Sequence, residues 1–183
     1  ITTPSGNVAV GIEIISYQGK DMDNQYTLPT QLTVNGRTMD VISIGDNAYR
    51  NVHSTSDADI TIYNENIVNI GNNAFQDINI RSITATNVET IGNYAFSGSK
   101  LNKGLFRSLI KLGDYALANL DDLYVLDLGP IQEFGYNCIF LVFSFITISF
   151  FTFFTVSISK KDNNNIVGKA QDNIVLFTTS GAV

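Results

Sequence analysis

Apolar residues recur along the chain with one spacing, and the copies follow one another about every 21 residues. The clearest copy contains Leu123, Leu126, Leu128, Ile131 and Phe134. The same spacing fits residues 80–91 without a gap, residues 101–112 at four of five positions, and residues 60–70 with one extra residue. Two apolar residues on either side of a single residue are typical of a strand with both side chains facing inward. We therefore expect one short strand in each copy.

A related six-residue motif closes each copy. The hexamers read IGDNAY, IGNNAF, IGNYAF, LGDYAL and FGYNCI, and they begin at residues 44, 70, 91, 112 and 134. Gly permits a close backbone approach or a positive φ. The third residue is Asp or Asn in the first four hexamers, and these residue types cap helix N-termini. We therefore expect each hexamer to begin a short helical or 3₁₀ turn, with its Ala and aromatic residue buried.

One such unit cannot bury its apolar side alone, so the units must stack. Parallel strands about 4.8 Å apart would line one side of the stack, and the short helical turns would line the other. The sequence therefore predicts an α/β fold of the leucine-rich-repeat class, a right-handed solenoid with a parallel β-sheet on one face.

The hexamer also carries a family resemblance. IGxxAF after an apolar strand resembles the BspA-like leucine-rich-repeat family of bacterial and protist cell-surface proteins, over roughly residues 44–140. Residues 28–45 resemble the segment that precedes the repeats in that family, and Asn35-Gly36 within them is a strong hairpin signal. The chain departs from the family in keeping only Pro130 of the usual prolines, and in placing Tyr136 at the capping position of the fifth hexamer.

The resemblance implies a function and a location. It indicates a non-enzymatic module for surface adhesion, located outside the cell or on its surface. The implied partner is a host or matrix protein, or another surface protein. Because the chain begins at Ile1 without a charged and then apolar leader, we expect that its N-terminus has been trimmed.

The pattern divides the chain into three parts. We expect residues 1–43 to form an N-terminal β cap, with a strand over 8–17 and the hairpin at Asn35-Gly36. Residues 44–159 would hold about five to six leucine-rich repeats. Residues 160–183 would form a C-terminal cap or tail, in which 174–177 reads as one last short strand.

The segment from 138 to 159 has three competing interpretations. It carries no charge and contains seven of the 12 Phe residues. Its length is sufficient to cross a membrane as a helix, and Lys160-Lys161 would then be its positive flank. Alternatively it is a sixth repeat, because its apolar residues fit the template at Phe145, Ile148, Phe150, Phe153 and Val156. We favour the terminal repeat over the membrane anchor or an irregular tail.

Composition excludes several function classes. The net charge is −6 and the basic residues are scattered, so a nucleic-acid partner is not expected. A single Cys and a single His leave no internal disulfide framework and no multi-Cys zinc site. The chain contains no phosphate-binding loop and no catalytic motif that we identify. We therefore expect no enzymatic activity, no metal and no cofactor.

The candidate binding residues lie on the outward side of the predicted strands. One predicted row contains Thr61, Thr84, Leu105, Asp127 and Ser149. Aromatic and Arg side chains anchor many interfaces, and three of them lie in or beside the predicted rows. The candidate binding residues are therefore Tyr63, Arg107, Tyr124 and Asp127. As an alternative function, the Phe-rich C-terminal edge would pair with a second copy, and the chain would be a self-associating spacer.

Overall fold

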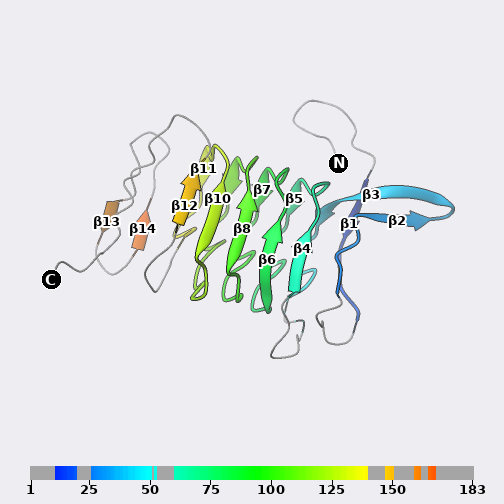
Figure 1. The fold of residues 1–183 in the computed structure, drawn as a ribbon, viewed down its shortest axis with the longest axis horizontal. Coiled ribbons are helices and arrows are strands. Elements are labelled where there is room, and N and C mark those ends of the chain that lie inside the picture. The colour runs from blue at the N-terminus through cyan, green and yellow to red at the C-terminus, as the bar shows by residue number, and fades with distance from the viewer. Residues whose placement is uncertain are drawn as a thin grey trace.

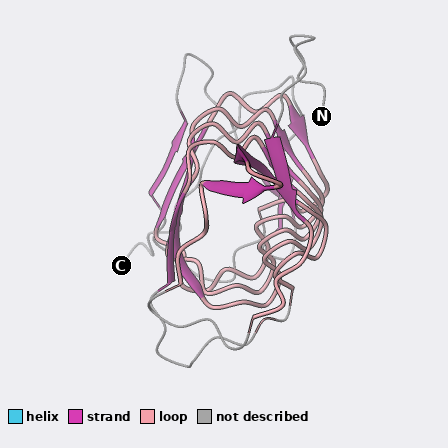
Figure 2. Ribbon diagram, turned by 90° about the vertical axis from the view of Figure 1, so that its right-hand side faces the viewer, coloured by secondary structure: helices cyan, strands magenta, loops and turns pink. Residues whose placement is uncertain are grey.

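The chain forms a solenoid of stacked coils (Figure 1). The structure, a computed structural model, describes residues 11–19, 26–50, 52, 60–139, 147–150, 159–161 and 165–167. Each coil contributes one longer strand and one short strand, and these belong to two different sheets. Viewed from the end, the two sheets lie on opposite sides of the coils, with turns joining them (Figure 2).

The long-strand sheet contains five parallel strands in the order β12-β10-β8-β6-β4. Its strands are β4 Ile60–Tyr63, β6 Ile80–Thr84, β8 Lys103–Phe106, β10 Val125–Leu128 and β12 Thr147–Phe150. The expected alternation is confirmed, because Ile60 and Ile62 are buried in β4 while Thr61 and Tyr63 are exposed. Because one face of each strand is buried, its apolar residues must face the core, and this fixes the register of the strand.

The short-strand sheet runs in the order β1-β3-β5-β7-β9-β11. Its strands are β1 Gly11–Ile14, β3 Arg37–Ile44, β5 Asn69–Ile70, β7 Thr90–Ile91, β9 Lys111–Leu112 and β11 Glu133–Phe134, and all pair in parallel. Strand β2, Gln31–Val34, pairs antiparallel with β3 around Asn35 and Gly36. Both turn residues have positive φ, 52° and 75°, so the predicted hairpin is confirmed.

The core is built from equivalent residues of successive coils. The first hexamer residues Ile44, Ile70, Ile91 and Leu112 are all buried. The sixth residues of the first three hexamers stack as aromatic rings, with centroids 5.1 Å apart for Tyr49–Phe75 and 5.3 Å apart for Phe75–Phe96. Such stacking adds to the apolar burial, so each coil depends on its neighbours for its core.

The hexamers form turns, and the described residues contain no helix. The expected helical turns are therefore not confirmed, and neither is the α/β class that rested on them. The reason lies in the backbone N–H groups of the fourth and sixth hexamer positions, which donate to the next coil, whereas those between and after them, such as Ala74 N and Gln76 N, donate within their own turn. Asn73 N donates to Asn93 O at 2.9 Å, and Phe75 N donates to Ala95 O at 2.7 Å. These bonds recur in the neighbouring coils, so the turns stack as an extension of the sheet.

Gly in the second hexamer position serves close approach between coils. A Cβ at Gly92 would lie 2.7 Å from the backbone N of Asn72, far inside contact distance. The positive φ occurs two residues later, at the fourth hexamer position. It is found at Asn47, Asn73, Tyr94, Tyr115 and Asn137, with φ between 47° and 59°.

The N-terminal end of the core is closed by tyrosines. Tyr17 stacks on Tyr49 with centroids 5.5 Å apart, and Tyr26 contacts both rings edge-on. The hydroxyls of Tyr26 and Tyr49 are 2.7 Å apart. Burial is the main cause that raises the pKa of both phenols. These rings cover the end of the aromatic stack, as a solenoid cap requires. The predicted boundaries at 43/44 and 159/160 remain predictions.

Part of the uncharged C-terminal segment is a strand. β12 pairs with β10 in parallel, with Ile148 opposite Leu126 and Phe150 opposite Leu128, which is the register that the sixth-repeat interpretation predicts. No helix in the described residues is long and apolar enough to span a membrane. Further along the chain than β12, strands β13 Ser159–Lys161 and β14 Asn165–Val167 form an antiparallel pair. The strand expected at 174–177 lies outside the described residues.

Candidate functional site

The outward row of the long-strand sheet differs from the predicted row in its first member. Thr84, Leu105, Asp127 and Ser149 are in register, as expected. Tyr63, and not Thr61, pairs opposite Thr84. Tyr63 therefore extends the row that contains Asp127, about 14 Å away across three strand spacings.

Two of the candidate residues form an ion pair. Arg107 Nε donates to Asp127 Oδ2 at 2.7 Å. The Asp127 side chain is 14% exposed, whereas the Arg107 side chain is 57% exposed. Because the exposed end of such a pair is screened by water, it adds little stability. Its effect is to hold the guanidinium in one place on the surface.

The two candidate tyrosines are exposed and lie apart. Tyr63 is 60% exposed at the end of β4, and Tyr124 is 52% exposed immediately before β10. A hydrogen bond to Glu65 raises the pKa of Tyr63, and Glu65 also accepts a hydrogen bond from Thr86 Oγ1. The structure thus does not gather the four candidates into one cluster, but distributes them along one sheet.

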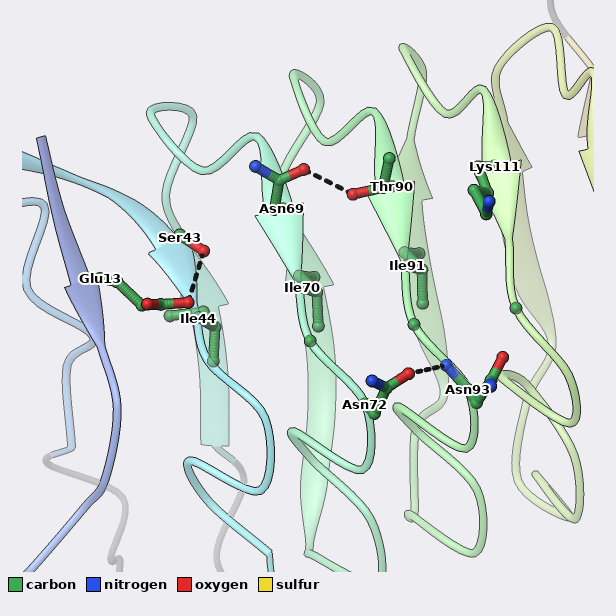
Figure 3. Close-up of a pocket in the computed structure, with 13 residues that line it drawn as sticks. Glu13, Ser43, Ile44, Asn69, Ile70, Asn72, Thr90, Ile91, Asn93 and Lys111 are labelled. Atoms are coloured by element: carbon green, nitrogen blue, oxygen red, sulfur yellow. Dashed lines mark hydrogen bonds between the residues drawn. The ribbon is translucent and has the colours of Figure 1, made fainter. Parts of the chain in front are cut away.

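A groove on the short-strand sheet was not among the predicted features. It has a volume of about 550 Å³ and crosses β3, β5, β7 and β9. Its floor carries no side chains at Gly71, Gly92 and Gly113. Figure 3 shows Asn69, Thr90 and Lys111 along one rim, and Asn72 and Asn93 along the other. A sequence signal was available, because the residue before every hexamer is polar: Ser43, Asn69, Thr90, Lys111 and Glu133.

The groove is lined by polar groups with partners in the neighbouring coils. Thr90 Oγ1 donates to Asn69 Oδ1, and Ser43 Oγ donates to Glu13 Oε1. Lys111 Nζ lies 2.7 Å from Glu133 Oε2. The rims therefore present hydroxyl and amide groups. The carboxylate of Glu13 lies at one end of the groove, and the ammonium of Lys111, paired with Glu133, lies at the other.

A second missed feature is a column of tyrosines, in which Tyr94 and Tyr136 are exposed and Tyr115 is partly buried. Tyr94 and Tyr115 stack with centroids 5.0 Å apart and planes 10° apart. Tyr136 meets Tyr115 edge-on at 5.5 Å and is 59% exposed. We call these three residues the tyrosine column. Its first member directly follows Asn93, so the column begins one residue beyond the groove's asparagine rim.

The remaining candidates for chemistry are few. Within the part of the chain that the structure describes, no three His, Cys, Asp or Glu side chains gather as a metal site would require. His53 lies outside the described residues. Cys138 is buried at the fifth hexamer position, and burial raises the pKa of its thiol to about 11, which makes it a poor nucleophile.

Comparison with known proteins places the repeats in a family. A solved structure of a leucine-rich cell surface protein from Faecalibacterium prausnitzii A2-165 is similar, with a TM-score of 0.48 and 16% sequence identity. The match covers 79% of this chain and 51% of that one, so this chain spans about half the other's length. No curated protein matches the sequence. The BspA-type leucine-rich repeat region matches residues 30–142 in six copies. The chain therefore belongs to the BspA-type leucine-rich repeat family.

Proposed function

We propose that this chain is a non-enzymatic protein-binding module, located outside the cell or on its surface. It binds its partner through the outward face of the long-strand sheet. The observation that carries this proposal is the exposure of Tyr63 and Tyr124, at 60% and 52%, on a rigid parallel sheet. Large exposed aromatic side chains on rigid elements are frequent interface anchors.

The Arg107–Asp127 pair supports the same face. Asp127 fixes Arg107 by one short contact, and the guanidinium has further donors for an acidic group of a partner. A solenoid repeats such positions on every coil, so a partner can lie along several strands at once. The family is typically non-enzymatic, and its partners by this proposal are a host or matrix protein or another surface protein.

The test uses the full chain and three single variants, Tyr63→Ala, Arg107→Ala and Tyr124→Ala. Their binding to immobilised matrix and surface proteins is measured by biolayer interferometry. We expect at least one variant to bind about tenfold more weakly, the loss typical of an interface anchor. Tyr136→Ala is the matched control, because Tyr136 is as exposed but lies on the hexamer corner. Wild-type affinity in all three variants would reject the outward face of the long-strand sheet as the binding site.

The alternative function, self-association, has an observation of its own. Among the described residues, strand β12 is the outermost strand of the long-strand sheet, and an outermost strand has one edge of backbone groups to offer a second copy. The alternative predicts a mass that rises with concentration in light scattering. A monomeric mass over the whole concentration range would exclude it.

A further inference from the structure

The groove on the short-strand sheet selects against a peptide ligand. A bound peptide strand gains affinity from main-chain hydrogen bonds. The floor's own N–H groups already donate to the preceding coil, since Gly71 N bonds Ile44 O and Gly92 N bonds Ile70 O, both at 2.8 Å. The rim side chains also bond to neighbouring coils, as Thr90 Oγ1 does to Asn69 Oδ1 and Asn93 Oδ1 does to Asp114 N. What remains for a ligand are the second acceptor lone pairs of these oxygens.

The spacing of the rims gives the same result. Equivalent rim residues such as Asn69 and Thr90 are paired across adjacent strands, so they recur at about 4.8 Å. An extended peptide repeats its same-side residues at about 6.8 Å, which does not match the coils.

The charges of the groove favour a neutral ligand. Between Glu13 and Lys111 the polar side chains of the rims are uncharged, namely Ser43, Asn69, Asn72, Thr90 and Asn93. Lys111 is paired with Glu133, which reduces its attraction for an anion. Hydroxyl and amide groups both donate and accept, as a ligand rich in hydroxyl groups requires.

The tyrosine column carries backbone strain that the fold does not need. Tyr94 and Tyr115 have φ of 56° and 52°, a region that costs a bulky residue about 1–2 kcal/mol. Other coils place Asn at this position, as at Asn73, which adopts the same region more easily. Strain of this kind concentrates at functional sites. Here it displays aromatic rings beside the asparagine rim of the groove.

We propose that the groove and the tyrosine column together form a binding site for a neutral linear polysaccharide. The rims bind sugar hydroxyls through Asn69, Thr90 and Asn93, and the column supplies aromatic surface to the outer part of the chain. This site is separate from the protein-binding face on the long-strand sheet.

The test titrates the full chain with linear oligosaccharides of β-linked glucose, xylose, mannose or N-acetylglucosamine, and with anionic polygalacturonate, by calorimetry. The double variant Tyr94→Asn/Tyr115→Asn retains a residue that suits the backbone, and Asn69→Ala removes one rim group. We expect a neutral oligosaccharide to bind, and each variant to bind it about tenfold more weakly. Tyr63→Ala/Tyr124→Ala on the other sheet is the control and keeps wild-type affinity.

Three results would overturn the proposal. The first is that no neutral oligosaccharide binds the wild-type chain. The second is that one binds, but with unchanged affinity in both the column and the rim variants while their melting curves show a folded chain. The third is that only polygalacturonate, or an extended Ser- and Thr-rich peptide used as a further probe, binds in a way that depends on Asn69.

Discussion

Asp114 Oδ1 accepts a 2.6 Å hydrogen bond from the backbone N–H of Tyr136, 22 residues further along the chain. The same bond joins Asp46 to Asn72, Asn72 to Asn93, and Asn93 to Asp114, at 2.7 or 2.8 Å. The third hexamer position thus links each coil to the next, instead of capping a helix.

Removing one link tests its contribution. Asp114→Ala leaves the Tyr136 N–H without its acceptor, and we expect a loss of about 1–2 kcal/mol in the free energy of unfolding. Asp114→Asn keeps an oxygen in place and is the matched control, with an expected change below about 0.5 kcal/mol. Urea denaturation measures both, and equal losses in the two variants would contradict the role of the acceptor.

The glycine row predicts a steric effect between coils. Gly92→Ala places a methyl group 2.7 Å from Asn72 N, and we expect a loss of about 2–3 kcal/mol as the coils move apart. Gly36→Asn is the comparison, because Gly36 has open space around it and a positive φ that Asn tolerates. We expect a loss below about 1 kcal/mol there. Thermal melting compares the stability of the two variants with that of the wild type. A Gly92→Ala variant as stable as the wild type would refute the close approach.

The aromatic stack predicts a graded response in the core. Phe75→Ala removes the ring between Tyr49 and Phe96, and we expect a loss of about 3–5 kcal/mol. Phe75→Leu should cost less than half as much, because Leu117 fills the same hexamer position two coils further along. Denaturant titration of both variants gives the ratio. Similar losses in the two would contradict this graded response, because they would mean that the apolar volume of Leu does not replace any of the ring's contribution.

Much of this fold could be predicted from the sequence, because the pattern and the fold share one repeat. The first repeat was aligned wrongly for a physical reason. Ile62 pairs with Ile83, so Asn64 occupies the inward position that Ala85 fills in the next coil. Asn64 is fully buried, and it is satisfied by donating to Pro29 O and accepting from Asn66 N. A buried polar residue cannot be recognised by an apolar template.

The groove and the column were harder to predict. The groove exists only because equivalent residues of different coils, such as Asn69 and Thr90, come into register. Tyr94 and Tyr115 are 21 residues apart and meet only through stacking of the coils. A prediction made one repeat at a time sees polar or aromatic residues in turns. The rows of equivalent residues become visible only when corresponding positions of successive coils are compared.

Buried acids predict a fall in stability at high pH. The raised pKa of Cys138, about 11 in the folded chain against 9.0 as its ordinary value, means that the unfolded chain loses this proton first. Stability is therefore complete below about pH 9 and falls as the pH approaches 11. Tyr26 and Tyr49, whose pKa values are also raised by burial, act in the same direction.

The measurement is the free energy of unfolding between about pH 7 and pH 11. Cys138→Ala, which restores the Ala found at this position in four other hexamers, should reduce the slope above pH 9 without abolishing it, since the tyrosines remain. A stability that does not change over this range would contradict the burial of these groups.

Amide hydrogen exchange tests the stacked turns most directly. In this account the N–H groups of Asn73, Tyr94, Phe75 and Phe96 donate to carbonyl groups of the next coil, so they exchange slowly, together with the strands. In a short helical turn the first N–H groups lack partners within the helix and exchange fast. Joint protection of these four amides is the predicted result. Exchange at the rate of an unstructured peptide would contradict the stacked solenoid.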